Sequence, residues 1–446
     1  MSHRKRKNPD TGLDDTPSLP PPKQSRTEHD NSNRHRASQH TLSLETSPKD
    51  PSPAFGQPQQ LTCFSYTPKR ELRFDTSALK YYVPAPINAD LGYRYEHWIK
   101  RPEERGRIDS LLRAIELEDV VRERKKGAFR NPSHLQRLLT APFETRDLVR
   151  LNLMYLDGCI YAEEHTDDAA LAEKENIHPR QRRMMYYGYS FESFSTWDEP
   201  LQRREQHMER DRVRCWSGDV DTNVQFCSIV KTKIGAERMI LGGEVDCCKD
   251  YYTGQPNAYV ELKTSMIIRS AQDEERFERK LLKFWAQSFL LGIPEIVVGF
   301  RTHQGRISTL QTFETLALPR MVRGKPGAWD PKPCLVFAEK LLRFIRSTLV
   351  EDKQSDYMAD PPGTGVGTAS GSVDTTKAEE TDEVKSSPIK KTNQRDATVW
   401  RLEIKPGTQM VTLYKLDPSE VEGVVNGEDR VGFLPTWFWE SAVGKI

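Results

Sequence analysis

Two stretches decide the fold of this chain: Ile240-Leu241-Gly242-Gly243-Glu244-Val245-Asp246-Cys247 and Ala258-Tyr259-Val260-Glu261-Leu262-Lys263-Thr264. Each predicts a β-strand, because apolar residues alternate with charged or small ones, and the turn-forming residues 253–257 lie between the two. Residues 273–291 predict a helix, since large apolar side chains recur at helical spacing and Gly292 suits its end. The apolar residues 295–301 predict a third strand. This order of elements predicts a mixed α/β (α+β) core.

Charged side chains share one face of each of the first two predicted strands. Residues two apart on a strand face the same side, so Glu244 projects with Asp246, and Glu261 with Lys263. Paired carboxylates repel each other and raise each other's pKa unless a cation neutralises them. If the two strands are neighbours, three carboxylates and one ammonium meet on one face. Such oxygen ligands suit Mg²⁺ or Mn²⁺, and the lysine can hold a phosphate or a nucleophilic water.

This pattern, Glu-x-Asp followed by Glu-x-Lys, is typical of metal-dependent phosphodiesterases of the PD-(D/E)XK class. In such a site one ion activates a water and a second stabilises the charge that develops on the leaving oxygen. The lysine, Lys263, then neutralises charge on the phosphate. The alternative interpretation is an exposed sheet edge whose alternating charges discourage aggregation.

Composition excludes several classes of protein. The 446 residues hold 66 Lys and Arg against 65 Asp and Glu, so the net charge of +1 excludes nucleic-acid binding through overall charge. Seven cysteines without a C-x-x-C pair argue against a disulfide framework or a zinc ribbon and favour a reducing compartment. We find no secretory signal and no apolar stretch near the roughly 20 residues of a membrane span. We therefore expect a soluble intracellular protein with no membrane partner.

Two segments are too polar to form a core. Residues 1–60 hold six large apolar residues and nine prolines, and residues 351–398 hold six large apolar residues. Such segments bury too little apolar surface to offset the entropy lost on ordering. We expect a disordered basic tail at 1–60, a folded domain at 61–350, a disordered insertion at 351–398 and the rest of the same domain at 399–446. The cluster Arg4-Lys5-Arg6-Lys7 indicates either a nuclear-import signal or a solvated basic tail.

Several blocks of the sequence resemble a known family. They are Gly188-Tyr189-Ser190-Phe191-Glu192, Gly243-Glu244-Val245-Asp246-Cys247, Val260-Glu261-Leu262-Lys263-Thr264-Ser265, Lys283-Phe284-Trp285-Ala286-Gln287-Ser288-Phe289-Leu290, Leu138-Leu139-Thr140-Ala141-Pro142-Phe143-Glu144, Thr222-Asn223-Val224-Gln225-Phe226-Cys227-Ser228 and Phe433-Leu434-Pro435-Thr436-Trp437. Together they resemble the DXO family of RNA 5′-end decapping nucleases, over about residues 61–350 and again from near residue 400. The resemblance implies a PD-(D/E)XK nuclease-like core of two packed mixed β-sheets flanked by helices, with a deep pocket between them.

The resemblance also implies a site. The implied catalytic residues are Glu192, Glu244, Asp246, Glu261 and Lys263. The implied ligands of a pair of Mg²⁺ or Mn²⁺ ions are the carboxylates of Glu192, Glu244, Asp246 and Glu261 and the backbone carbonyl of Leu262. The implied substrate contacts are Arg70, Phe129, Arg130, Cys227, Glu244, Lys263 and Gln287.

Two places depart from the family pattern. After Arg130, Asn131-Pro132-Ser133 stand where the family has a glycine, with about two extra residues, so the local backbone differs. A glutamate that contacts the substrate in the family aligns with Gly106, and Glu103 and Glu104 are the nearby residues that could replace it.

The resemblance implies a substrate and a setting. The substrate is an RNA 5′ end with a triphosphate, an unmethylated or incomplete guanosine cap, or an NAD cap, and the product is 5′-monophosphate RNA. A nuclear 5′→3′ exoribonuclease of the Rat type requires that product and is the implied partner, so the implied location is the nucleus. Three alternatives stay open: a non-catalytic subunit that stabilises this exoribonuclease, a distributive 5′→3′ exoribonuclease, and a DNA endonuclease. Because an idle cluster of like charges would cost stability, the intact carboxylates weigh against the non-catalytic alternative.

Overall fold

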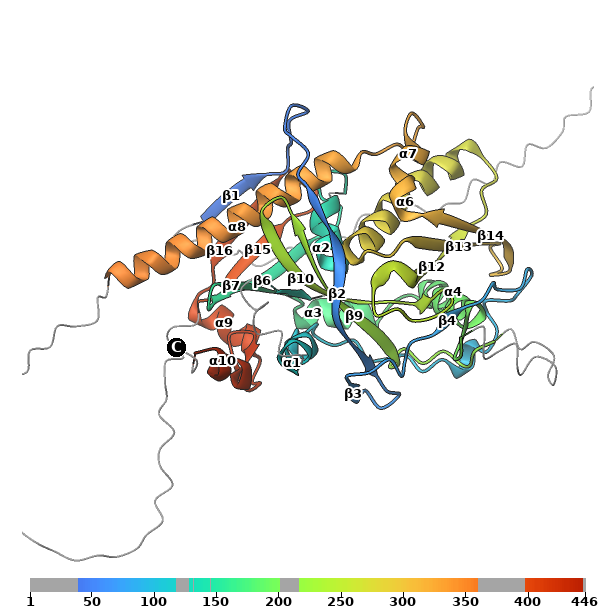
Figure 1. The fold of residues 1–446 in the computed structure, drawn as a ribbon, viewed down its shortest axis with the longest axis horizontal. Coiled ribbons are helices and arrows are strands. Elements are labelled where there is room, and N and C mark those ends of the chain that lie inside the picture. Colours follow the sequence, from blue (N-terminus) through green and yellow to red (C-terminus); the bar gives the residue numbers. More distant parts are fainter. Residues whose placement is uncertain are drawn as a thin grey trace, which may run out of the picture. The chain divides into compact units, whose positions relative to one another are not determined.

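The computed structural model describes residues 39–117, 128–130, 132–144, 146–200, 216–359 and 398–443. Within these ranges the strands form a ten-stranded sheet, a six-stranded sheet and a two-stranded ribbon, accompanied by helices (Figure 1). None of the helices in these ranges is long and apolar enough to cross a membrane. The basic cluster at residues 4–7 lies outside the described residues.

The larger sheet is mixed. Its strands follow the spatial order β1 (Gln39–Ser43), β16 (Met410–Lys415), β15 (Trp400–Ile404), β6 (Val149–Leu156), β7 (Cys159–Glu164), β5 (Ala128–Arg130), β10 (Glu237–Glu244), β9 (Gln225–Ile234), β2 (Phe55–Tyr66) and β3 (Leu72–Arg73). β5 is parallel to both of its neighbours, and the other neighbouring pairs are antiparallel. Because β15 lies beside β6, strands from the last part of the chain complete a sheet that begins with much earlier residues.

The smaller sheet is also mixed. Its strands follow the order β14 (Ile307–Glu314), β13 (Glu295–Arg301), β12 (Tyr259–Met266), β11 (Cys247–Cys248), β4 (Tyr81–Tyr82) and β8 (Thr196–Trp197). β12 is parallel to β13, and β11 is parallel to β4, whereas the remaining neighbours are antiparallel. The predicted α/β (α+β) architecture with two mixed sheets and flanking helices is therefore confirmed.

The chain passes from the larger sheet to the smaller one at Val245 and Asp246. β10 ends at Glu244 and pairs with β5 and β9, whereas β11 begins at Cys247 and pairs with β12 and β4. The prediction of one continuous strand over residues 240–247 is therefore wrong. Apolar and charged residues keep alternating through the crossing, so the pattern does not reveal that the strand changes sheets. Glu244 thus ends one sheet, and Asp246 comes just before the other.

Helix α6 (Ala271–Leu291) agrees with the helix predicted over residues 273–291. At its start the Ser270 hydroxyl accepts a hydrogen bond from the Asp273 N–H at 3.1 Å, which satisfies a donor that the helix leaves unpaired. At its end Gly292 has a φ of 75°, a left-handed conformation that glycine adopts without strain. The third predicted strand, over residues 295–301, is β13.

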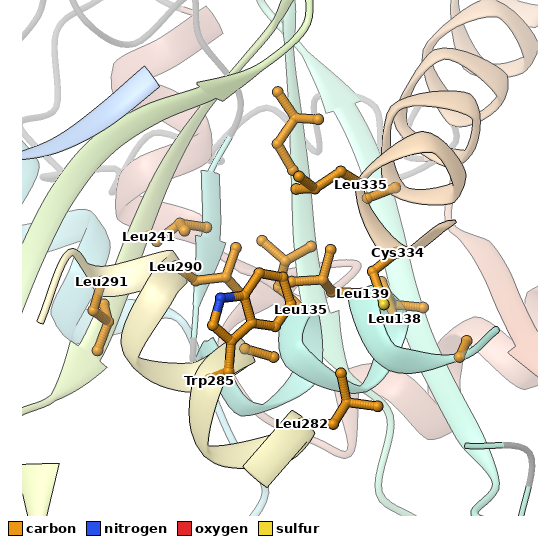
Figure 2. Packing of buried hydrophobic residues seen from close by; sticks show 14 of the residues in the cluster. Leu135, Leu138, Leu139, Leu241, Leu282, Trp285, Leu290, Leu291, Cys334 and Leu335 are labelled. Carbon is orange, nitrogen blue, oxygen red and sulfur yellow. The ribbon is translucent and has the colours of Figure 1, made fainter. Parts of the chain in front are cut away.

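The core around α6 connects this helix to the larger sheet. Figure 2 shows Trp285 of α6 among Leu138 and Leu139 of α2 (Pro132–Thr140), with Leu241 of β10 and Leu335 of α8 (Pro331–Ala359) nearby. The Trp285 side chain is fully buried, and removing such a side chain typically costs about 3–5 kcal/mol of stability. This packing fixes the position of the helix that also carries Gln287.

Helix α4 (Pro179–Ser195) packs closely against the smaller sheet. Phe191 of α4 is fully buried, and a Cβ atom added at Gly299 of β13 would lie 2.5 Å from the Phe191 ring. Glycine at position 299 therefore allows the close approach of the helix. The next residue of α4, Glu192, is thereby held beside this sheet.

The expected disordered tail at residues 1–60 is wrong for residues 39–60, which contain β1 and the first half of β2. β1 pairs with β16 along its whole length, Leu44 is 1 % exposed, and Phe55 stacks on Phe289 with ring centroids 4.0 Å apart. Composition averaged over sixty residues hid this, because half of the large apolar residues there lie between positions 42 and 55. Residues 1–38 lie outside the described part of the chain.

The expected start of the insertion also differs from the structure. Helix α8 runs to Ala359, nine residues past the expected boundary at residue 350. Residues 351–356 are all polar or charged, so the composition does not reveal these last turns of the helix. Residues 360–397 lie outside the described residues.

Candidate active site

Four carboxylates from separate parts of the fold lie close together. Glu192 belongs to α4, Glu244 ends β10, Asp246 lies in the crossing between the sheets, and Glu261 belongs to β12. Burial, with the charges of Asp246 and Glu244 added, raises the pKa of Glu192 well above its usual range. Burial and the Asp246 charge raise the pKa of Glu244 and of Glu261 to about 7, and burial raises the pKa of Asp246. The Glu244 side chain is exposed in the adjoining pocket, Glu192 and Asp246 are half-buried, and Glu261 is fully buried.

One carboxylate oxygen of Glu261 accepts hydrogen bonds, and the other has no hydrogen-bond partner among the described residues. Its Oε1 accepts hydrogen bonds from the Lys263 ammonium and, at 2.6 Å, from Nε2 of Gln287. Its Oε2 is buried and accepts no hydrogen bond from any described residue. A buried carboxylate oxygen without a partner carries a desolvation cost, so this atom is a candidate ligand for a cation.

Asp246 is held by the backbone of the neighbouring strand. Its Oδ2 accepts a hydrogen bond from the N–H of Leu262 at 2.7 Å. This contact brings the crossing between the sheets against β12. The structure thus brings Asp246 and Glu261 together, although Asp246 lies in the crossing between the sheets, before β11 begins to pair with β12.

The Lys263 ammonium lies among these carboxylates. Burial alone would lower the pKa of this side chain, but the charges of Glu261 and Asp246 outweigh burial and raise the pKa above its usual value. Lys263 is therefore protonated at neutral pH. A fixed positive charge at this position suits a phosphate group.

Two other predicted substrate contacts, Arg70 and Cys227, lie beside this cluster. Arg70 donates to the carbonyl of Asn223 at 2.9 Å and to Oε1 of Gln225 at 2.8 Å. Cys227 of β9 lies opposite Glu244 of β10 in the strand register. Both residues thus lie on the larger-sheet side of the site.

The structure places the backbone of the remaining predicted contacts on β5. Phe129 pairs with Leu241 and Arg130 pairs with Gly242, two residues before Glu244 on β10. The side chains of Phe129 and Arg130 lie outside what the structure describes. Helix α2 begins at Pro132, so two of the residues that depart from the family pattern, Pro132 and Ser133, belong to its first turn. Residue 131 lies outside the described residues.

Two pockets open on Glu244. One has a volume of about 300 Å³ and also contains Glu192, Asp246 and Tyr189, and the other has a volume of about 200 Å³ and also contains Cys227. Arg101, Glu104, Gln225 and Glu244 line both pockets. Glu104 lines the smaller pocket together with Gly106, whereas Glu103 lines only the larger one and pairs with Lys100 at 3.1 Å. Of the two glutamates near Gly106, Glu104 is therefore better placed for a substrate in the smaller pocket.

Two residues of the site, Arg101 and Gln225, were not predicted from the sequence. Nη1 of Arg101 donates to Oε1 of Gln225 at 3.1 Å, and Nε2 of Gln225 donates to Oε2 of Glu244 at 3.0 Å. The only available signal was the position of Gln225 two residues before Cys227 in one of the quoted blocks. No pattern around Arg101 distinguishes it from the many arginines of this chain.

The carboxylates fit a divalent cation by their chemistry. Carboxylate oxygens are the ligands that Mg²⁺ and Mn²⁺ prefer, and Oε2 of Glu261 is a buried oxygen without a partner among the described residues. Within the described ranges no three His, Cys, Asp or Glu side chains are already arranged to hold a metal ion. Glu192, Glu244, Asp246 and Glu261 would therefore have to turn toward a shared ion.

Comparison with known proteins confirms the resemblance drawn from the sequence blocks. The family described as RAI1 like PD-(D/E)XK nuclease matches residues 56–365. The Decapping nuclease RAI1 of Mycosarcoma maydis is 34 % identical over 470 residues, which cover 90 % of this chain and 90 % of that protein. The Decapping and exoribonuclease protein of Rattus norvegicus is 36 % identical over 328 residues, which cover 70 % of this chain and 80 % of that protein.

Solved structures agree with the sequence comparison. S. pombe Rai1, crystallised in complex with 3′-FADP, has a TM-score of 0.61 and 28 % identity, and the match covers 85 % of this chain and 100 % of that chain. Candida albicans Rai1 shares the fold with a TM-score of 0.68 at 23 % identity, over 92 % of this chain. This chain belongs to the RAI1-like family of PD-(D/E)XK nucleases, enzymes whose curated relatives are named for decapping.

Proposed function

We propose that this chain is a metal-dependent hydrolase that removes caps or terminal phosphates from the 5′ end of RNA. The observation that carries the proposal is the cluster of Glu192, Glu244, Asp246 and Glu261 around the Lys263 ammonium. The decapping names of the relatives from Mycosarcoma maydis and Rattus norvegicus support it. The complex of S. pombe Rai1 with 3′-FADP supports a site that accepts a nucleotide.

The proposed substrates are RNAs with a 5′ triphosphate, an unmethylated or incompletely methylated guanosine cap, or an NAD cap. In each case the product is RNA with a 5′ monophosphate. The two pockets that meet at Glu244 give room for groups on both sides of a scissile phosphate. A distributive 5′→3′ exoribonuclease activity is the second candidate, favoured by the name of the relative from Rattus norvegicus.

The residues of the chain have separate roles in this reaction. A divalent ion, or a pair of ions, held by Glu192, Glu244, Asp246, Glu261 and the Leu262 carbonyl would supply a nucleophilic water and a Lewis acid. Lys263 places its positive charge beside the phosphate, where it stabilises the charge of the transition state. Gln287 holds Oε1 of Glu261, so Oε2 stays free to act as a ligand. Cys227 lines the smaller pocket and would contact the part of the substrate there, and Arg70 lies beside it through its hydrogen bond to Gln225.

The proposed product suggests a partner protein and a location in the cell for this chain. A nuclear 5′→3′ exoribonuclease of the Rat type requires a 5′ monophosphate, so we propose that it binds this chain and that both act in the nucleus. The basic cluster Arg4-Lys5-Arg6-Lys7 supports nuclear import. Co-elution of the two purified proteins tests the partnership, and the location of a variant with these four residues changed to alanine tests the import signal.

The decisive experiment uses RNAs that differ only in their 5′ end, incubated with the full chain and Mg²⁺ or Mn²⁺. Release of pyrophosphate, of a cap dinucleotide or of mononucleotides would separate triphosphate hydrolysis, decapping and exonuclease activity. The Glu244→Ala/Asp246→Ala variant serves as the control for contaminating nucleases. The absence of any product from all of these RNAs with the wild-type protein would contradict the proposal.

A further inference from the structure

The carboxamide of Gln225 joins three charged side chains at the first residue of β9. Its Oε1 accepts hydrogen bonds from Nη1 of Arg70 at 2.8 Å and from Nη1 of Arg101 at 3.1 Å. Its Nε2 donates to Oε2 of Glu244 at 3.0 Å. A guanidinium can only donate and a carboxylate can only accept, so these neighbours fix the orientation of the amide.

Two features hold Gln225 in place. Its backbone pairs with Tyr66 of β2, and the next residue, Phe226, accepts a hydrogen bond from the N–H of Val245 in the crossing between the sheets at 3.0 Å. The carboxamide therefore reaches Glu244 from a backbone that is itself tied to the segment carrying Asp246. Such support of a ligand by a neighbouring side chain is what fixes the geometry of metal sites.

The two arginines bring like charges close together. Burial, together with the charge of Arg101, lowers the pKa of Arg70, and the Arg70 guanidinium lies 3.6 Å over the Tyr66 ring. Arg101 pairs with Glu104, whose carboxylate lies 3.7 Å away and is well exposed. No carboxylate of the described residues lies within ion-pair distance of Arg70, so Oε1 of Gln225 is the shared acceptor that holds both guanidiniums together.

We propose that Gln225 is a positioning residue that orients Glu244 for the reaction and holds Arg70 and Arg101 toward an anionic group on the RNA. Gln225 lines both pockets, together with Arg101 and Glu244, so it stands at the boundary where the reacting phosphate would lie. A carboxamide suits this position because it both accepts from the arginines and donates to the carboxylate. The inference rests on the proposed function, and it adds a link between the arginines that recognise the substrate and a carboxylate that acts on it.

Two variants separate the parts of this role. Gln225→Leu keeps a similar volume but removes the donor and the acceptor. Gln225→Glu keeps the acceptor for both arginines but loses the donor to Glu244 and places a second carboxylate beside it. Gln311→Leu, which changes an exposed glutamine on β14, is the matched control.

The measurements are kcat and KM on 5′-triphosphate RNA, the affinity for Mn²⁺ by calorimetry, and the melting temperature. Gln225→Leu should lower kcat and Mn²⁺ affinity by roughly 10- to 100-fold, the usual loss when a supporting partner of a ligand is removed, and should raise KM. Gln225→Glu should lower kcat by a similar factor but leave KM near the wild-type value, because the arginines keep their acceptor. A purely structural role would lower the melting temperature of both variants without this difference in KM. Gln311→Leu should change none of these quantities.

The outcomes distinguish the inference from the proposed function. If Gln225→Leu keeps wild-type kcat, KM and Mn²⁺ affinity, the inference is overturned while the proposed function stands. If the wild-type protein hydrolyses none of the RNAs, the proposed function fails, and the Mn²⁺ affinity and the binding of triphosphate RNA still decide whether Gln225 acts as proposed. If Gln225→Leu does not fold, Gln225→Asn takes its place, because its shorter amide cannot reach all three partners. Wild-type Mn²⁺ affinity and RNA binding in Gln225→Asn would then overturn the inference.

Discussion

Lys263 and Glu261 are bound to each other across one face of β12: the Lys263 ammonium donates to Oε1 of Glu261, two residues earlier on the strand. The Glu261 side chain is 0 % exposed, whereas that of Lys263 is 24 % exposed. The ammonium therefore reaches from a buried carboxylate toward solvent. This direction lets one side chain stabilise the buried carboxylate and still approach a bound phosphate.

Replacing this lysine should slow the reaction without removing the metal. Lys263→Gln loses a preorganised positive charge, and loss of one such transition-state contact typically costs about 2.7–4 kcal/mol, so turnover should fall by about 10²- to 10³-fold. Lys263→Arg keeps the charge but changes its shape, so it should recover only part of the activity. Single-turnover rates and Mn²⁺ affinity check this prediction. A wild-type rate for Lys263→Gln would mean that the Glu-x-Lys pattern is a coincidence of strand alternation.

Removing a carboxylate should abolish hydrolysis while the fold persists. Asp246→Ala and Glu261→Ala each delete a proposed ligand, and EDTA should have the same effect on the wild-type protein. Relief of the repulsion among the carboxylates is offset by loss of the hydrogen bond from the Leu262 N–H, so the metal-free Asp246→Ala variant should melt close to the metal-free wild type. Glu314→Ala, an exposed change on β14, is the control. Undiminished activity of Glu244→Ala/Asp246→Ala would rule out this ligand assignment.

The close packing of α4 on the smaller sheet can be tested at Gly299. An added Cβ would lie 2.5 Å from the Phe191 ring, so Gly299→Ala should displace α4 and move Glu192 away from the other carboxylates. We expect a loss of stability of about 1–3 kcal/mol, typical of overpacking, together with weaker Mn²⁺ binding. The double variant Gly299→Ala/Phe191→Leu makes room for the methyl group and should recover part of both losses. Denaturant unfolding and calorimetry provide the two measurements, and unchanged Mn²⁺ affinity in Gly299→Ala would show that the helix position does not control the site.

Two N-terminal truncations test whether β1 and the first half of β2 stabilise the fold. A protein that lacks residues 1–38, with residues 360–397 replaced by a short Gly-Ser linker, should hydrolyse triphosphate RNA at nearly the wild-type rate. Removal of residues 1–60 should instead lower the melting temperature strongly, because β1 and half of β2 leave the larger sheet. Equal melting temperatures for the two N-terminal truncations would contradict the structural role of β1.

One histidine should make the protein less stable in acid. Burial and the charges of Arg401 and Arg150 lower the pKa of His165 to about 3, from a usual value near 6.5. The folded state thus resists protonation, so the contribution of this residue to stability is complete above pH 6.5 and declines as the pH falls toward 3. The slope is at most about 1.4 kcal/mol per pH unit, and it is smaller here because solvent reaches part of the ring. Unfolding at pH 7 and pH 5 should show a smaller difference for His165→Gln than for the wild type, and an equal difference would contradict the assignment.

Much of the site could be predicted because its parts are local in sequence. The strand with Glu261 and Lys263, and the helix with Gln287, follow from periodicity and from turn and capping residues. Periodicity does not show that this strand and this helix pack together. The resemblance to the family predicted that their side chains share one site. The structure agrees with the helix to within two residues at its start.

The remaining parts depend on contacts between distant segments. Gln225 lies 155 residues from Arg70 and 124 residues from Arg101, so no local pattern shows that they share a hydrogen-bond acceptor. The change of sheet at Val245 and Asp246 likewise depends on which strands lie alongside, and the alternation of side chains is the same in either sheet.

The pairing of β1 with β16 has a consequence for the synthesis of the protein. Gln39 lies opposite Tyr414, so β1 leaves the ribosome long before its partner exists. Until then its backbone N–H and C=O groups on that side are unpaired, and such an edge can pair with another chain. Because pairing across so long a separation is slow, completion of the larger sheet must wait until residues 410–415 have been synthesised. A nascent chain that stops before residue 410 would carry this open edge permanently, which makes prematurely terminated products of this protein prone to aggregate.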